Sequence, residues 1–184
     1  MILTISGTPG SGKSTVAKLI AKELKLNHYS AGDFMRKIAE EREMQLAELQ
    51  QLAALDGGEI DKETDKRTVE LAEKEDNFII DSRLAFHFIP SAIKIFLTVK
   101  PEVAAERIFG DVQKQRRGQE QDIHNLDDAI KSVKDRLARD ISRYKQHYNI
   151  DYVAKENYDL IVDTSNKTPE KIVKEIVEFV KNHW

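Results

Sequence analysis

Short apolar runs recur along the chain and alternate with stretches whose apolar residues have helical spacing. The strong runs cover residues 2–5, 78–80, 93–99 and 160–162, and a weaker one covers residues 27–30. Continuous apolar runs of this length are typical of strands that are buried on both faces of a parallel sheet. Because helical stretches separate them, the pattern predicts an α/β fold in which helices cover a parallel sheet of about five strands.

The first apolar run leads directly into a glycine-rich loop. Residues 7–14 read Gly-Thr-Pro-Gly-Ser-Gly-Lys-Ser, which matches the phosphate-loop (P-loop) pattern G-x-x-x-x-G-K-[ST] at every fixed position, and a helical stretch follows. The glycines let successive N–H groups point at anionic oxygens, and the helix N-terminus adds partial positive charge. This order predicts the P-loop NTPase fold and a site for ATP. The residues expected to contact it are Gly7, Thr8, Pro9, Gly10, Ser11, Gly12, Lys13, Ser14 and Thr15.

The end of this loop and the end of a second strand suggest a metal site. Lys13 can reach the β- and γ-phosphates, and the hydroxyl of Ser14 can hold Mg²⁺. Asp81 follows the apolar run 78–80, where a carboxylate can bind the ion or its water. We therefore expect ATP and Mg²⁺ as cofactors, with Ser14 and Asp81 at the metal.

Two segments exceed what a minimal core of sheet and helices needs. Residues 31–75 are mostly helical and charged, and residues 110–126 are polar with little apolar content. Ligands bind at the carboxyl ends of strands in open parallel sheets. We therefore expect a helical substrate-binding insertion at 31–75 and a lid at 110–126, for which the alternative is an ordinary surface loop. The core of this single domain would comprise residues 1–30, 76–109 and 150–184.

A long helix is predicted over residues 127–149, and it carries a stripe of charge beside its apolar face. Arg136, Arg139, Asp140 and Arg143 lie at i, i+3, i+4 and i+7 and share one side of the helix. A charged stripe is often only a solvated surface. Three arginines, however, suit phosphate because guanidinium binds it with two parallel hydrogen bonds. Next to a P-loop and a lid, the stripe favours a phosphate-binding role.

Composition narrows the class of partner. The net charge of the 184 residues is −3 at pH 7, which argues against general nucleic-acid binding. No apolar run approaches the roughly 18 residues needed to span a bilayer. Cysteine is absent, which excludes disulfides and thiolate metal sites. We expect a cytoplasmic monomer whose partners are small-molecule nucleotides, with no nucleic acid and no membrane among them.

Taken together, these motifs resemble those of the nucleoside monophosphate kinases, and most closely those of the archaeal-type cytidylate kinases. The resemblance covers nearly the whole chain. Besides the P-loop, it rests on Ser30-Ala-Gly-Asp-Phe-Met-Arg36, Ile80-Asp-Ser-Arg-Leu84, Lys94-Ile-Phe-Leu97, the R-x-x-R-D-x-x-R spacing of residues 136–143, and Asp163-Thr-Ser165.

The resemblance implies an enzyme, a phosphotransferase that moves the γ-phosphoryl group of ATP to CMP or dCMP. Arg36 and Arg83 would hold the acceptor phosphate, and Arg136 would contact the transferring phosphoryl group when the lid closes. Arg107 is expected beside ATP and the transferring group. The catalytic residues so implied are Lys13, Arg83, Arg136, Asp140 and Arg143, of which the last two would engage the monophosphate and its sugar.

The chain departs from the bacterial cytidylate kinases in two places. Ser82-Arg83-Leu84 stands where those enzymes have Gly-Arg-Asp, so an aspartate that contacts the base is missing, and Lys62 falls where they carry an arginine. How the base is recognised is therefore open. Further candidates for substrate binding are Asp33, Lys62, Asp65, Arg67 and Arg139. The alternatives are an adenylate- or uridylate-type kinase, or a P-loop regulatory protein, against which the arginine cluster argues.

Overall fold

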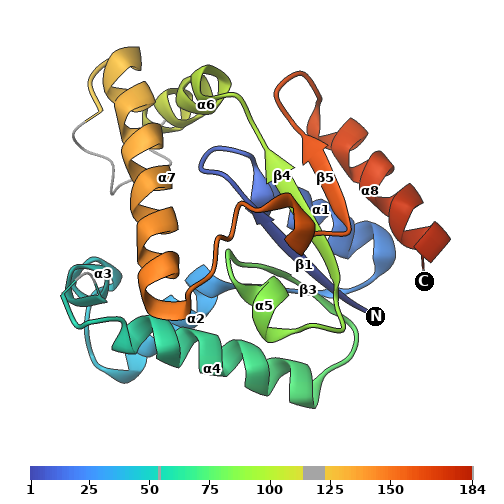
Figure 1. The fold of residues 1–184 in the computed structure, drawn as a ribbon, viewed down its shortest axis with the longest axis horizontal. Helices are drawn as coiled ribbons and strands as arrows, with labels where there is room; N and C mark the ends of the chain where they lie inside the picture. The colour runs from blue at the N-terminus through green and yellow to red at the C-terminus, as the bar shows by residue number, and fades with distance from the viewer. Residues whose placement is uncertain (54, 114–122, 184) are drawn as a thin grey trace.

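A computed structural model describes residues 1–53, 55–113 and 123–183. Within these ranges, five parallel strands form one sheet in the order β2-β3-β1-β4-β5, with the first strand in the middle (Figure 1). The prediction of a parallel sheet of about five strands is confirmed. The strands are β1 (Ile2–Gly7), β2 (Asn27–Ser30), β3 (Phe78–Asp81), β4 (Ile93–Thr98) and β5 (Leu160–Asp163).

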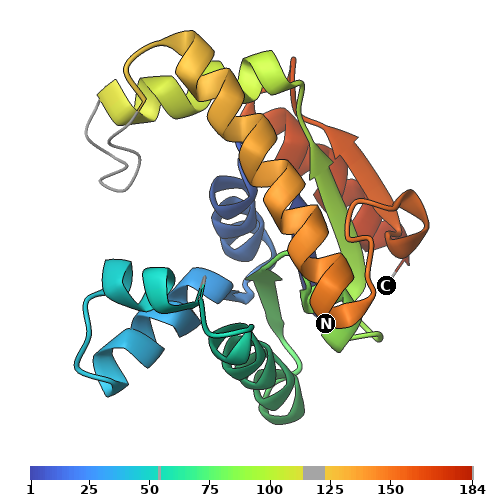
Figure 2. The same ribbon diagram turned by 60° about the vertical axis from the view of Figure 1, so that its left-hand side comes forward.

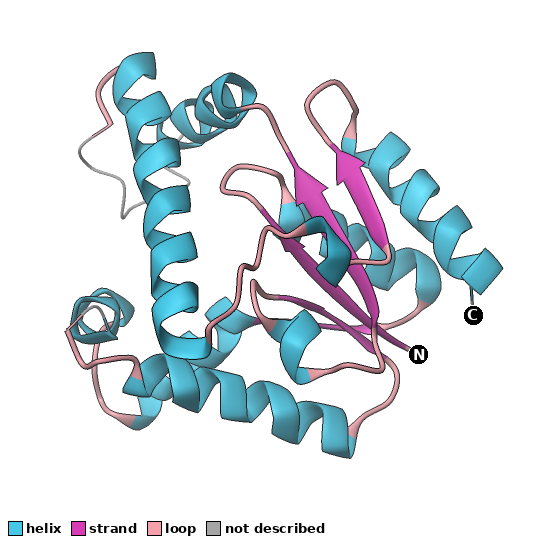
Figure 3. Ribbon diagram, in the orientation of Figure 1, coloured by secondary structure: helices cyan, strands magenta, loops and turns pink. Residues whose placement is uncertain are grey.

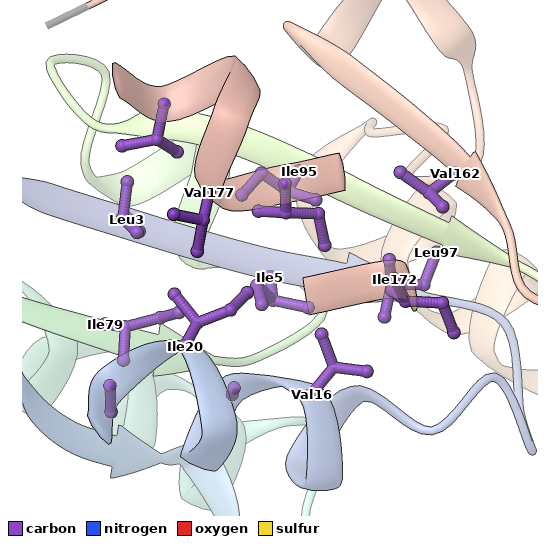
Figure 4. Close-up of a cluster of buried hydrophobic side chains, with 14 of the residues drawn as sticks. Leu3, Ile5, Val16, Ile20, Ile79, Ile95, Leu97, Val162, Ile172 and Val177 are labelled. Atoms are coloured by element: carbon purple, nitrogen blue, oxygen red, sulfur yellow. The ribbon is translucent and has the colours of Figure 1, made fainter. Parts of the chain in front are cut away.

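Helices cover both faces of the sheet (Figure 3). On one face lie α1 (Lys13–Leu24) and α8 (Pro169–His183), which bury a continuous apolar cluster against the strands (Figure 4). Successive strand residues point to opposite faces, so Ile79 joins this cluster while Phe78 and Ile80 pack on the other side. The apolar runs are therefore continuous because each strand is buried on both faces.

The second face is covered by α5 (Ala85–Phe88), by the last turns of α7 (Leu126–Tyr148) and by residues 150–158, which include the 3₁₀ turn η1 (Lys155–Asn157). Aromatic side chains dominate this contact, and Tyr152 is completely buried in it. The packing anchors the end of α7 to the sheet, which matters because α7 carries the charged stripe.

The described residues between β2 and β3 form three helices, α2 (Ala31–Glu41), α3 (Leu46–Ala53) and α4 (Glu59–Lys74). They share an apolar cluster of their own around Ile38 and Leu49. Figure 2 shows α2 and α3 set apart from the helices that cover the sheet, and α4 also packs on the residues around α5 through Leu71 and Ala72. This unit occupies the span of the expected insertion.

The helices α6 (Pro101–Gln113) and α7 pack along each other through an apolar cluster that includes Ile108 and Val133. The helix predicted at 127–149 is confirmed to within a residue at each end. α6 takes in residues 110–113, the start of the expected lid, while residues 114–122 lie outside the described ranges, so the lid stays a prediction. In the ranges that are described, no helix is long and apolar enough to cross a membrane.

Candidate active site

A cleft of about 2090 Å³ opens at the carboxyl ends of the central strands. Its walls come from the P-loop, from α2 and α4, from the residues after β3, and from α6 and α7. A pocket for one small ligand usually occupies roughly 300–1,000 Å³. The cleft therefore has room for more than one nucleotide-sized molecule.

The P-loop needs glycine where it passes other parts of the chain. Gly10 has a φ of +75°, and a Cβ built on it would lie 2.7 Å from the Cβ of Ala104. A Cβ on Gly7 would lie 2.4 Å from the carbonyl oxygen of Leu97. Only a residue without a side chain fits at either position. The loop is thereby held tightly against β4 and α6.

Lys13 lies half-buried at the centre of this loop. Its Nζ donates to the carbonyl oxygens of Gly7 at 3.0 Å and Thr8 at 3.3 Å. Burial, and then the positive charges of Arg83 and Arg136, lower the pKa of Lys13 to about 7. Three cationic side chains thus gather where an anion relieves their repulsion, which is what a bound phosphate supplies.

The two expected metal ligands lie next to each other. Ser14 Oγ donates to Asp81 Oδ1 at 3.2 Å, and His28 Nε2 lies 3.0 Å from Asp81 Oδ2. Asp81 is buried, and burial raises its pKa against the opposing effect of His28. A hydroxyl and a carboxylate beside a phosphate loop fit Mg²⁺, which usually takes one or two protein oxygens and keeps several waters.

The charged stripe of α7 faces the residues that follow β3. Arg83 Nε forms an ion pair with Asp140 Oδ2 at 2.7 Å, and Arg143 Nη2 lies 3.6 Å from the other oxygen of Asp140. Asp140 is only 8% exposed. Arg136 and Arg139 also line the cleft. The structure therefore brings the five residues expected to be catalytic to one cleft.

Arg107 reaches the P-loop from α6 by a different route. Its guanidinium donates to the carbonyl oxygen of Gly10 at 3.2 Å, and to the hydroxyl and carbonyl oxygens of Thr164 at 3.1 and 2.6 Å. These bonds tie the P-loop to the segment after β5. Arg107 lines the cleft, and its contact with ATP remains a prediction.

Four candidates for substrate binding do not line the cleft. Arg36 and Asp33 pair with each other at the exposed start of α2, and Lys62 pairs with Glu59 on the outer side of α4. Arg67 forms ion pairs with a glutamate of α2 and another of α4. A role in binding would require these side chains to leave their present partners.

Two aspartates on the inner side of α4 line the cleft instead. Asp61 Oδ2 lies 3.2 Å from Arg143 Nη1, and the Tyr148 hydroxyl donates to Asp65 Oδ2. Burial raises the pKa of both carboxyls, that of Asp65 to about 6. Sequence reasoning considered Asp65 and overlooked Asp61. Their i, i+4 spacing places them on one helix face and is a signal that was available.

Solved structures with this arrangement include the shikimate kinase of Bacteroides thetaiotaomicron. It has a TM-score of 0.67 and 17% identity, and the alignment covers 98% of each chain. At this identity the likeness concerns the fold alone. The fold and the P-loop together define a protein of the P-loop NTPase class.

The sequence comparisons narrow the class to a family. Residues 6–128 match the family model described as an AAA domain. The cytidylate kinase of Methanobrevibacter smithii is 34% identical over 181 residues, which cover 98% of this chain and 99% of that one. The cytidylate kinase of Methanococcoides burtonii is 39% identical over 165 residues, 90% of this chain and 88% of that one. The chain belongs to the archaeal-type cytidylate kinase family, so the resemblance is confirmed.

Proposed function

We propose that this protein is a cytidylate kinase, which transfers the γ-phosphoryl group of ATP to CMP or dCMP and releases ADP and CDP or dCDP. The observation that carries the proposal is the cleft at the P-loop. There Lys13, Arg83 and Arg136 lie together in a chain that matches cytidylate kinases over nearly its full length. The helices α2–α4 would form the wall that holds the monophosphate.

On the ATP side, the loop supplies the contacts that orient the phosphates. Backbone N–H groups and the N-terminus of α1 bind the anionic oxygens, and Lys13 moves from the loop carbonyls to the transferring group. Ser14 and Asp81 would hold Mg²⁺, which neutralises charge on the β- and γ-phosphate oxygens when bound. A phosphate next to Lys13 favours its protonated form, so the lysine is charged when it acts.

On the acceptor side, the arginines overcome the repulsion between two anions. A phosphate oxygen of CMP forms a bond to the γ-phosphorus as the bond from that phosphorus to the β–γ bridging oxygen breaks, and ADP leaves with the bond's electrons. Arg83 and Arg136 stabilise the charge that this step spreads over the phosphoryl oxygens. Asp140 holds Arg83 in place through its ion pair.

The test is ADP release in a coupled assay with ATP, Mg²⁺ and a panel of CMP, dCMP, UMP, AMP and GMP. We expect CMP and dCMP to be the best acceptors, UMP to be poorer, and the purine nucleotides to be barely used. AMP as the fastest acceptor would instead indicate an adenylate-type kinase. Nucleotide binding without turnover of any acceptor would favour a regulatory protein.

A further inference from the structure

The position of the acceptor's base follows from the direction of α7. Arg136 lies near Lys13 at the phosphate end, and Arg143 comes seven residues later on the same face, about 10 Å farther along the helix axis. Figure 1 shows the last turns of α7 approaching α4. An acceptor that lies along α7 with its phosphate between Arg83 and Arg136 would have its base at the contact between these two helices.

That contact is rich in hydrogen-bond acceptors. Asp61 and Asp65 project from α4 toward α7 and line the cleft. The buried Oδ2 of Asp61 is ion-paired with Arg143 but makes no hydrogen bond to any residue that the structure describes. Asp140 adds a third carboxylate, which Arg83 and Arg143 share. At this end of the cleft, Arg143 and Tyr148 hold the Oδ2 atoms of Asp61 and Asp65, and the second oxygen of each carboxylate can accept a hydrogen bond from a ligand's N–H group.

Cytosine and uracil differ at the position that such oxygens can distinguish. Cytosine carries an amino group at position 4, which donates two hydrogen bonds, whereas uracil carries a carbonyl oxygen there. An ionised carboxylate accepts from the amino group and repels the carbonyl. A buried mismatch of this kind lowers kcat/KM by about tenfold to a hundredfold.

We propose that Asp61 and Asp65 make this enzyme prefer CMP over UMP, because their carboxylates accept hydrogen bonds from the 4-amino group of cytosine. The inference rests on the proposed function and adds the residues that read the base. The Tyr148 hydroxyl orients the Asp65 carboxylate, and Arg143 orients that of Asp61. Leu84, which follows Arg83, is buried and apolar and offers no such group.

The experiment measures kcat/KM for CMP and for UMP in the wild type and in the variants Asp61→Asn and Asp65→Asn. An amide can turn its N–H toward the uracil carbonyl, so each variant should lower the CMP:UMP ratio about fivefold or more, with CMP use falling and UMP use unchanged or rising. Glu70→Gln, on the exposed side of α4, is the matched control and should keep the wild-type ratio. Equal losses for both substrates, or an unchanged ratio in both aspartate variants, would overturn the inference.

The pH dependence of the CMP:UMP ratio in the wild type is a second test, and it does not depend on whether a variant folds. Asp65 faces Tyr148 and Arg143 from α7 and Asp61 from its own helix, and its pKa is raised to about 6. Below that pH the neutral carboxyl can donate to uracil, so the CMP:UMP ratio should decline between pH 8 and pH 5.5. Titration of the substrate phosphate and of Lys13 affects both substrates alike and cancels in the ratio. A constant ratio would contradict a role for Asp65.

The outcomes separate the inference from the proposed function. A wild type that does not phosphorylate CMP would overturn the proposed function and this inference with it. A wild type that uses CMP and UMP equally well leaves a pyrimidine monophosphate kinase and overturns the inference alone.

Discussion

The P-loop end of the cleft and the end between α4 and α7 differ in which buried charge is disfavoured: a lysine at the first and two aspartates at the second. At the first, burial and the nearby Arg83 and Arg136 lower the pKa of Lys13 to about 7. At the second, burial raises the pKa of Asp61 and of Asp65. Burial is the first cause of these pKa shifts at both ends, and a ligand group of complementary charge or hydrogen-bonding character offsets it. The difference indicates a cleft organised for phosphate at one end and for N–H donors at the other.

The largest loss of activity is expected from a substitution at the P-loop end of the cleft. Replacing Lys13 with alanine removes the charge that lies closest to the transferring phosphoryl group, so kcat should fall by a factor on the order of 10² or more. The fold should survive, because the hydrogen bonds that Nζ makes within the described part of the chain go to carbonyl oxygens of the P-loop. Steady-state ADP release and a thermal melt measure the two properties. Lys18→Ala, on the exposed side of the same helix, is the control, and near-normal turnover of the Lys13 variant would remove this lysine from the mechanism.

A smaller loss of activity is expected for Arg83, which lies at the same end of the cleft as Lys13. Arg83→Lys keeps the charge but loses the planar fork that binds phosphate, so the KM for CMP should rise about tenfold while the KM for ATP changes little. Initial rates with each substrate varied in turn measure the split. Arg42→Lys, in an exposed ion pair of the helical insertion, should leave both constants unchanged. A rise confined to the KM for ATP would show that Arg83 serves the donor nucleotide instead.

At the opposite end, a substitution should stabilise the fold. Folding raises the pKa of Asp65 to about 6 from an unfolded value of about 3.9. The folded protein therefore binds this proton more tightly, and ionised Asp65 destabilises the fold above pH 6 but not below pH 4. Asp65→Asn should thus raise the free energy of unfolding by about 1–3 kcal/mol at pH 8. Urea unfolding at several pH values tests this, and a gain that persists at pH 4 would point to another cause.

The P-loop end was the more predictable of the two because its parts are contiguous in sequence. The glycine loop, Lys13 and Ser14 lie in one motif, and Asp81 ends a strand that the apolar pattern identifies. The parallel sheet and the long charged helix were predictable for the same reason, since each depends on a local periodicity.

The remaining features depend on contacts between distant segments. His28 reaches Asp81 only because β2 pairs with β3, which no local pattern specifies. The sequence makes Arg67 a candidate for substrate binding, but the packing of α2 against α4 places glutamates beside it. Asp61 faces the cleft because the end of α7 packs beside α4, and that packing is a tertiary property.

The most direct test of the division between the two ends compares Arg83→Lys with Asp65→Asn in one assay. The quantity is the CMP:UMP ratio of kcat/KM, with ATP and Mg²⁺ saturating. If Arg83 serves the phosphate and Asp65 the base, Arg83→Lys lowers kcat/KM for both acceptors equally and leaves the ratio at the wild-type value, whereas Asp65→Asn lowers the ratio about fivefold or more. A ratio that changes as much in Arg83→Lys as in Asp65→Asn would contradict the account.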